Sequence, residues 1–247
     1  MIPFLEEKLI IPSYLADEQA QLSVTSLFKL LQEASDRHAA LLGAGWFDLQ
    51  DRGYFWVLTK MLVHINRLPK WQEEVLLRTW VRASEAATSP RDFEIEDTNG
   101  NLLVSARAIW AILDTEQGRP QRMDMFDVQF LPQERCALDH RPPKIGPLTL
   151  PETLPEAKTA LYSDLDMNHH VNNAHYIQWA FDSFDENFQR SHQLTEIAVN
   201  FIAQAKLGDQ YVVCSQPTTE NSIKTTILSA DHSTEFCRLL TTWTIDH

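Results

Sequence analysis

Residues 93–113 read FEIEDTNGNLLVSARAIWAIL, and this stretch decides the fold class. Two runs rich in apolar and β-branched residues flank Asn99-Gly100. Asn-Gly between such runs is the strongest short signal for a hairpin, because both residues tolerate the positive φ of a type I′ turn. The stretch therefore predicts two antiparallel strands, at residues 93–96 and 102–113, joined by a type I′ turn.

The residues before this hairpin predict a helix and two more strands. Apolar side chains between residues 27 and 42 recur at the i, i+3, i+4, i+7 spacing of an amphipathic helix. Thr25 is the expected N-cap of this helix and Gly43 its expected end. The β-rich runs at 54–65 and 75–81 predict strands, so the first half is one helix followed by strands.

The second half repeats this order. Its predicted helix has one apolar face, formed by Ala174, Ile177, Phe181, Phe184 and Phe188. Asn172 or Asn173 is expected to cap the start of this helix. Strands are predicted at residues 197–201, 211–214, 223–228 and 236–245. The order predicts an α+β fold in which each half is a curved antiparallel sheet wrapped around one long helix, the two halves packing together so that neither sheet is left open.

Prolines divide the chain. Six of the twelve prolines fall between Pro132 and Pro155, in a stretch with little periodicity. Proline removes amide donors and favours extended chain, so the stretch is typical of a linker. We expect an N-terminal unit at 1–131, a Pro-rich linker at 132–158 and a C-terminal unit at 159–247.

Composition excludes several classes of function. The net charge of −13 argues against nucleic acid, which binds mainly through Lys and Arg. No glycine falls in a nucleotide-binding motif, and no apolar run is long enough to span a membrane. We predict no cofactor, no metal and no membrane span. The N-terminus shows no secretory signal, which predicts a protein of the cytoplasm.

Residues 161–179, LYSDLDMNHHVNNAHYIQW, carry the chemistry. Asp164, Asp166, Asn168 and His170 alternate with other residues, so an extended chain would place their side chains on one side. They would then meet beside the free amides and positive dipole end of the following helix, where an oxyanion is stabilised. A carboxylate, a carboxamide and an imidazole at such a place suit acyl transfer to water.

Several of these residues also have a structural explanation, as an alternative to a catalytic role. Asp164, Asn172 and Asn173 are each open to an interpretation as helix caps, and His169 and His175 as structural histidines. A metal site built from these aspartates and histidines is the less favoured alternative, because helical ligands usually pair at i and i+4.

The segment resembles the signature D-L-D-x-N-x-H-V-N-N-x-x-Y-x-x-W of plant and bacterial acyl-acyl carrier protein (acyl-ACP) thioesterases, with Tyr176 and Trp179 in place. Similar stretches in the first half are Leu31–Glu33, His38–Ala39, Trp56–Met61, Asn66–Trp71, Thr79–Val81 and Arg91–Asp92. The resemblance implies a tandem (double) hot-dog fold, with the acyl chain held mainly in the N-terminal half and catalysis in the C-terminal half. It also implies hydrolysis of fatty acyl-ACP during fatty-acid synthesis.

The resemblance assigns the site residues. Catalytic roles fall on Asp166, Asn168 and His170, and substrate binding is expected at Trp56 and at the helix start, Asn172 and Asn173. Plant relatives carry a Glu-Cys pair in the strand after the second helix, but this chain has Gln204 and Ala205 there. A carboxamide cannot act as a base, so we expect Gln204 at most to support catalysis by holding water or His170.

The repeated halves suggest one active site per chain. Aligning Asp17 with Asp164 sets Gln19, Gln21 and Ser23 opposite the three predicted catalytic residues. The first copy would then have kept the fold and lost the acid and the imidazole.

Three functions follow as alternatives: an acyl-ACP thioesterase, an acyl-CoA thioesterase or dehydratase on the same scaffold, and a non-catalytic acyl-binding module. The expected partner is an acyl carrier protein bearing a fatty acyl chain, and a homodimer is a further expectation. Basic residues near the linker are candidates for meeting this acidic carrier: Arg119, Arg122, Arg135, Arg141 and Lys144. Plant relatives have a chloroplast leader that is not seen here, which favours a bacterial, cytoplasmic protein.

Overall fold

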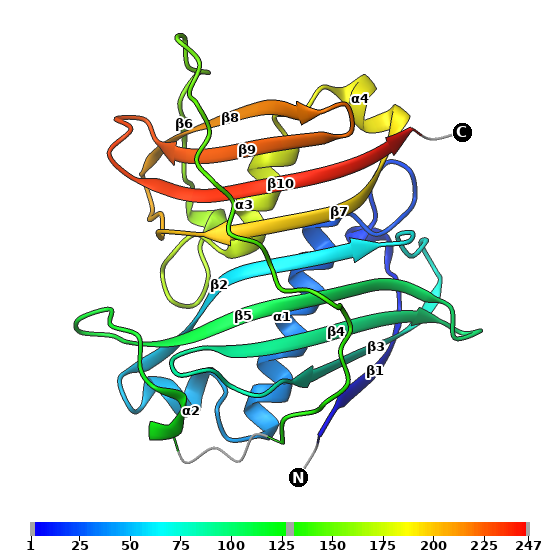
Figure 1. Cartoon of the computed structure of the whole chain (residues 1–247), viewed down its shortest axis with the longest axis vertical. Coiled ribbons are helices and arrows are strands. Elements are labelled where there is room, and N and C mark those ends of the chain that lie inside the picture. The colour runs from blue at the N-terminus through cyan, green and yellow to red at the C-terminus, as the bar shows by residue number, and fades with distance from the viewer. Residues whose placement is uncertain (1–2, 127–130, 246–247) are drawn as a thin grey trace. The chain divides into compact units, whose positions relative to one another are not determined.

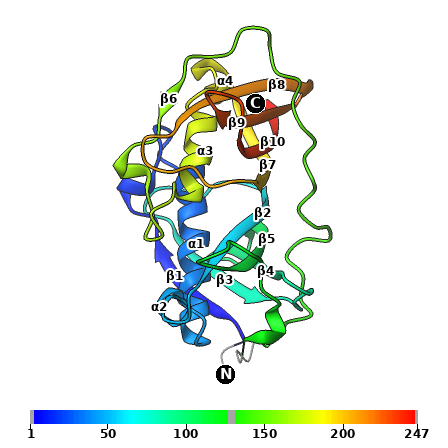
Figure 2. The same ribbon diagram turned by 90° about the vertical axis from the view of Figure 1, so that its left-hand side faces the viewer.

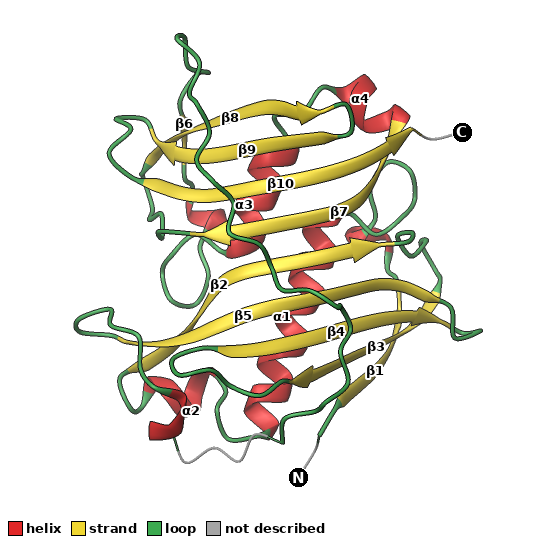
Figure 3. Ribbon diagram, viewed as in Figure 1, coloured by secondary structure: helices red, strands yellow, loops and turns green. Residues whose placement is uncertain are grey.

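The computed structural model describes residues 3–126 and 131–245 (Figures 1 to 3). Contacts within the chain separate it into two compact units, Met1–Pro142 and Pro143–His247. The boundary lies inside the predicted linker.

The first unit is an antiparallel sheet with one long helix. Its strands are β1 (Leu5–Ile10), β2 (Tyr54–Ile65), β3 (Glu74–Val81), β4 (Ser89–Asp97) and β5 (Leu102–Asp114). They pair in the order β1-β3-β4-β5-β2. Its helices are η1 (Ser13–Leu15), α1 (Val24–Leu41), α2 (Trp46–Gln50) and η2 (Met123–Met125). The predicted strands and the long helix are confirmed.

Helix α1 buries one face against the sheet (Figure 2). Leu27, Leu31 and Ala34, at the predicted spacing, are almost fully buried. The helix begins earlier than predicted, because Ser23 and not Thr25 is the N-cap: its Oγ accepts the Ser26 N–H at 3.1 Å. The predicted end is confirmed by Gly43, whose φ of 74° suits the residue after a C-cap.

The hairpin at Asn99-Gly100 is confirmed, but its turn type is different. Gly100 has a φ of 81°, whereas Asn99 is not among the residues with positive φ, so the turn is not type I′. The Asp97 carboxylate accepts the N–H groups of Asn99 and Asn101, both at 2.9 Å. Side-chain capping of this kind stabilises a turn with only one left-handed residue.

The second unit repeats the arrangement. Its strands are β6 (Lys158–Thr159), β7 (His192–Phe201), β8 (Gln210–Thr219), β9 (Ser222–Ser229) and β10 (Glu235–Ile245). They pair in the antiparallel order β7-β10-β9-β8-β6. Its helices are η3 (Tyr162–Asp164), α3 (Asn173–Phe181) and α4 (Glu186–Ser191), and α3 contacts β8 and β9 (Figure 3).

The single second helix of the prediction is in fact two. Helix α3 ends at Phe181, and Asp185 starts α4 by accepting the Phe188 N–H at 2.9 Å. The three phenylalanines of the predicted stripe remain on the core side, because Phe181, Phe184 and Phe188 all pack against Trp243. The apolar pattern therefore runs on across two helices, because the N-cap Asp185 starts a new helix within it.

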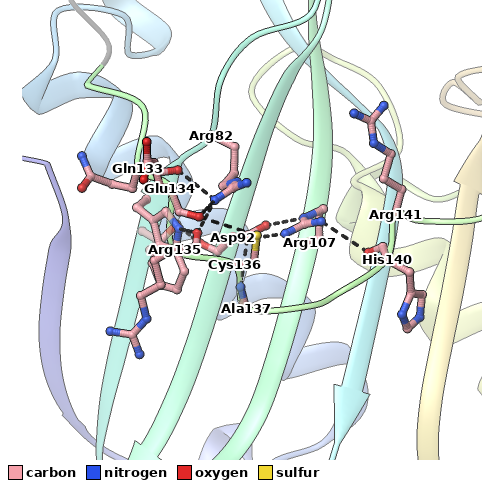
Figure 4. A network of polar contacts seen from close by, with 12 residues as sticks. Arg82, Asp92, Arg107, Gln133, Glu134, Arg135, Cys136, Ala137, His140 and Arg141 are labelled. Atoms are coloured by element: carbon pink, nitrogen blue, oxygen red, sulfur yellow. Dashed lines mark hydrogen bonds and ion pairs between the residues drawn. The ribbon is translucent and has the colours of Figure 1, made fainter.

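The start of the predicted linker is fastened to the first unit (Figure 4). The Asp92 carboxylate, fully buried on β4, accepts two hydrogen bonds from the Arg107 guanidinium at 2.6 Å and one from the Ala137 N–H at 3.0 Å. Arg82 donates to the Gln133 carbonyl at 2.9 Å, and Trp80 Nε1 to the Arg135 carbonyl at 2.9 Å.

The later part of the linker contacts the second unit. The Ile145 N–H donates to Asn200 Oδ1 at 2.9 Å, and Arg238 donates to the Ile145 carbonyl at 2.8 Å. Leu148 and Leu154 pack on the apolar cluster of β8 and β9. The stretch is irregular, as predicted, but hydrogen bonds and, further on, apolar contacts hold it to the two units.

Candidate active site

Residues 164–171 form a closed turn and not the extended segment that the alternation suggested. The Asp166 N–H donates to the His170 carbonyl at 2.8 Å, and His169 has a φ of 61°. Asp166 Oδ1 accepts the N–H groups of Asn168 at 2.8 Å and His170 at 3.4 Å. The carboxylate of Asp166 thus folds the chain on itself. All three predicted catalytic residues lie on this one turn, which we call the acid turn (residues 166–170).

The acid turn leads directly into helix α3. Asn172 is the N-cap, with Oδ1 accepting the Ala174 N–H at 2.9 Å, so its predicted capping role is confirmed. Within the described part of the chain the Asn173 N–H donates no hydrogen bond. This free amide lies at the positive end of the helix dipole, where it can donate to a developing oxyanion.

Asp164 has a structural role at the start of the turn. Its carboxylate accepts the Leu161 N–H at 2.7 Å and lies 3.2 Å from Nδ1 of His175 on α3. Its carbonyl accepts the Asn172 N–H at 2.8 Å. Asp164 therefore joins η3 to the helix start, which is the capping interpretation, and His175 is its partner.

A second loop lies beside the acid turn. The Ala205 carbonyl accepts the Val171 N–H at 2.9 Å, and the Ala205 N–H donates to the Tyr176 hydroxyl at 2.8 Å. Burial raises the pKa of Tyr176, so its hydroxyl stays protonated. These bonds bring Gln204, the residue before Ala205, to the edge of the site, where it is exposed. Its supporting role stays a prediction.

The surroundings of His170 favour a neutral imidazole. Partial burial lowers the pKa of His170, the Asp166 carboxylate opposes this, and electrostatic interactions with Lys206 and His169 lower the pKa further. The imidazole is therefore mainly unprotonated near neutral pH and able to accept a proton.

The first unit contains the same turn without the imidazole. Asp17 Oδ1 accepts the N–H groups of Gln19 at 2.9 Å and Gln21 at 3.2 Å, and the Asp17 N–H donates to the Gln21 carbonyl at 2.8 Å. Ala20 has a φ of 56°. Asp17 therefore corresponds to Asp166 and not to Asp164.

This register corrects the predicted alignment by two residues. Gln19 corresponds to Asn168, Gln21 to His170, and the N-cap Ser23 to the N-cap Asn172. The first copy kept the acid and replaced the carboxamide and the imidazole with two glutamines. The sequence match failed because it aligned similar residues, whereas the hydrogen bonds of the turn define the equivalent ones.

Trp56, the predicted acyl-binding residue, lies on β2 of the first unit. It packs on an apolar cluster with Leu49, Ile112 and Phe126, and its Nε1 donates to the Ala44 carbonyl at 2.8 Å. An apolar cluster suits an acyl chain, but contact between Trp56 and an acyl chain stays a prediction.

Residues 3–126 and 131–245 contain no group of three or more His, Cys, Asp or Glu side chains placed to hold a metal ion. The histidine and aspartate pair of His175 and Asp164 is therefore a two-residue contact.

Sequence reasoning missed Lys206 and the Tyr176 hydroxyl. Lys206 follows Ala205, so the bond between Ala205 and Val171 brings it near His170. Only contact between residues far apart in the chain reveals this. For the Tyr176 hydroxyl, which accepts the Ala205 N–H, the sequence held one signal: a tyrosine at this position is part of the family signature.

Two family models match most of the chain. The acyl-ACP thioesterase N-terminal domain matches residues 4–126, and the acyl-ACP thioesterase C-terminal domain matches residues 155–245.

Several plant enzymes are similar to the chain. The chain is 27% identical over 254 residues to a chloroplastic palmitoyl-acyl carrier protein thioesterase of Gossypium hirsutum, covering 94% of this chain and 61% of the relative. It is 28% identical to the chloroplastic oleoyl-acyl carrier protein thioesterase 1 of Arabidopsis thaliana, covering 93% of this chain and 68% of the relative. The chain thus spans less than two thirds of the Gossypium protein.

Solved structures of similar fold confirm the predicted tandem hot-dog architecture. An acyl-ACP thioesterase from Bacteroides thetaiotaomicron matches with a TM-score of 0.84 at 22% identity, covering 98% of both chains. A 12:0-ACP thioesterase from Umbellularia californica matches with a TM-score of 0.85 at 20% identity, covering 100% of this chain and 99% of the other. With both family models matched along its length, the chain belongs to the acyl-ACP thioesterase family.

Proposed function

We propose that this protein hydrolyses fatty acyl-ACP thioesters to a free fatty acid and the carrier, ending chain elongation in fatty-acid synthesis. The observation that carries the proposal is the acid turn, which places Asp166, Asn168 and His170 directly before the free amide of Asn173. Membership of the acyl-ACP thioesterase family supports the same reaction.

The proposed reaction is attack of water on the thioester carbonyl. Asp166, or His170 acting as the neutral base, takes the proton of the attacking water. The carbonyl oxygen becomes an oxyanion, to which the Asn173 N–H donates. Collapse of the intermediate breaks the carbon–sulfur bond, and the leaving thiolate takes up the proton. Direct attack by Asp166, through an anhydride that water then hydrolyses, is the alternative use of the same carboxylate.

The remaining polar groups would position the reactants. Asn168 carries its carboxamide on the acid turn and would hold the acyl carbonyl or the water. Gln204, which stands where plant relatives have glutamate, has no basic oxygen and would at most orient water. Asp166 and His170 therefore supply the acid–base chemistry.

Release of free acid tests the proposal. Purified protein is given acyl-ACP and acyl-CoA of matched chain length, and the free acid is measured against time. We expect a higher kcat/KM for the carrier substrate, and His170→Ala should lower kcat by at least about 100-fold. A higher kcat/KM for acyl-CoA would favour the acyl-CoA thioesterase instead, and unchanged turnover in His170→Ala would remove the assigned base.

The replacement of the family Glu by Gln204 supports a second candidate, a non-catalytic acyl-binding module. Binding of acyl-ACP with no acid released, followed by activity in Gln204→Glu, would establish it. The hydrolase is preferred, because the acid turn keeps the carboxylate, the carboxamide and the imidazole together.

The cellular location and the oligomeric state of the protein are separate proposals. No helix in the described part of the chain is long and apolar enough to cross a membrane. A bacterial cytoplasmic location stays a prediction, testable by fractionation of the source cells. The homodimer also stays a prediction, and sedimentation of the purified protein measures it.

A further inference from the structure

Large apolar side chains gather on the two loops of the second unit that carry the site. They are Leu161, Tyr162, Met167, Ile202 and Leu207, and between 50% and 81% of each is exposed. We call these residues the rim patch. Exposed apolar side chains in one place are typical of an interaction surface, whereas scattered single ones need no explanation.

Backbone hydrogen bonds hold the two loops side by side. The Ala160 N–H donates to the Asp209 carbonyl at 2.9 Å, and the Gly208 N–H donates to the Ala160 carbonyl at 3.0 Å. At the other end, Val171 donates to Ala205 at 2.9 Å. The same loops lie next to the start of α3 in both views (Figures 1 and 2). The rim patch is therefore fixed in place before any partner arrives, which reduces the entropy lost on binding.

Most of the predicted basic residues near the linker already pair with carboxylates of the first unit. Arg122 pairs with Asp124, and Arg135 and Arg141 pair with Glu94 and Glu85. Three of the five basic residues are thus neutralised by carboxylates of the first unit. The protein as a whole carries a net charge of −13, so long-range attraction of an acidic carrier is not expected.

One cation lies within the rim patch. Lys206 lies between Leu207 and Ala205, whose carbonyl accepts the Val171 N–H. Among the described residues the Lys206 ammonium forms no ion pair with a carboxylate. Asp209 accepts the backbone N–H of Lys206 at 2.8 Å, and Asp166 accepts amides of the acid turn, so both carboxylates accept hydrogen bonds from the backbone. A single free cation in an apolar surface suits an acidic partner that binds mainly by burying apolar area.

We propose that the rim patch, with Lys206, is the docking surface for the acyl carrier protein. This inference rests on the proposed function, because a thioester presented on a protein brings that protein's surface to the mouth of the site. The rim patch lies beside the acid turn. Met167 belongs to both, and Tyr162 and Leu207 lie on the segments that backbone hydrogen bonds hold next to the turn. Apolar contact around the mouth then positions the prosthetic arm.

The test is Tyr162→Ser/Leu207→Ser, measured in two ways. Anisotropy of a fluorescently labelled holo carrier gives the Kd, which we expect to rise about tenfold. Hydrolysis of acyl-ACP is compared with hydrolysis of the same acyl group on free pantetheine. The ratio of the two kcat/KM values should fall about tenfold, because only the carrier contacts the rim patch. Lys206→Glu should weaken carrier binding further, since it replaces the cation with an acid.

The first unit offers a matched control. Tyr14, on η1, is 83% exposed and Tyr162, on η3, is 81% exposed, so Ile10→Ser/Tyr14→Ser removes a similar apolar pair from another surface. This control should keep the carrier Kd and the substrate ratio of the parent protein. An equal melting temperature for both double variants shows that the fold is retained.

The outcomes separate the two proposals. If no acid is released from any substrate, the proposed function fails, and the carrier Kd alone then decides the docking surface. An unchanged Kd and ratio in Tyr162→Ser/Leu207→Ser would overturn the inference, as would an equal effect of the control. If the rim variants instead change the mass of the protein in sedimentation, the surface is covered by a second copy and the inference is wrong.

Discussion

At the scale of single residues, Asp17 and Asp166 perform the same structural task. Each accepts two backbone N–H groups across its turn, and each turn has one residue of positive φ. What differs is the neighbouring chemistry, glutamine in the first unit and imidazole in the second. The same substitution at Asp17 is therefore a control for any substitution of Asp166.

We predict that Asp166→Asn lowers kcat by at least about 100-fold, whereas Asp17→Asn leaves kcat within about twofold. Both variants should lose a similar, small amount of stability, because the asparagine Oδ1 can still accept the amides that Oδ1 of the aspartate accepts at each turn. Turnover of acyl-ACP and thermal unfolding measure the two effects. Equal losses of turnover in both variants would mean that Asp166 only shapes the turn.

The pKa of His170 gives a prediction for pH. Burial and electrostatic interactions with Lys206 and His169 lower this pKa against the opposing effect of Asp166. A base must be unprotonated, so activity should persist below neutral pH and be lost as the pH falls through the pKa of His170. Lys206→Met removes one lowering charge, so the acid limb of kcat should move to higher pH. A profile of kcat against pH for both proteins measures this, and an unmoved limb would contradict the assignment of His170 as the base.

At the scale of elements, the irregular chain after residue 131 is bound to the first unit by side chains of its strands. Asp92 on β4 and Arg107 on β5 form a buried pair, and Asp92 also holds the Ala137 N–H (Figure 4). Because Arg91 and Asp92 are neighbours in a strand, their side chains point to opposite faces. Arg91 contacts His38 of α1 at 2.9 Å, while Asp92 faces the segment after residue 131.

Breaking the Asp92–Arg107 pair should destabilise the first unit strongly. Asp92→Asn leaves the Arg107 charge buried without its carboxylate, which costs about 3–5 kcal/mol of unfolding free energy. The exposed pair of Arg141 and Glu85 is the control, and Arg141→Gln should cost no more than about 1 kcal/mol. Chemical denaturation measures both. A loss of under about 1 kcal/mol in Asp92→Asn would show that the pair contributes little.

At the scale of the whole molecule, the net charge opposes binding of the proposed acidic partner. A chain of net charge −13 repels an acidic carrier, so salt should assist their encounter. We predict that raising ionic strength from about 20 to about 150 mM increases kcat/KM for acyl-ACP by about two- to threefold. Hydrolysis of the neutral pantetheine thioester is the reference, since it should respond little to salt. A fall in kcat/KM with salt would indicate a basic docking surface elsewhere.

The sequence by itself determined the elements and the family of this protein. Period-two and helical patterns, the hairpin at Asn99-Gly100 and the capping residue Asn172 are local signals, and the structure confirms these elements, although not the turn type, the Thr25 cap or the single second helix. The signature at Asp166, Asn168 and His170 also lies within one short segment, so it could be read without the fold.

Tertiary structure alone decided how these groups are used. The bond from Val171 to Ala205 brings Lys206 near His170, and the bond between Asp92 and Ala137 fastens the linker. Even the register of the internal repeat required the hydrogen bonds of Asp17. A side chain's partners depend on residues distant in the chain, whereas periodicity reports only on neighbours.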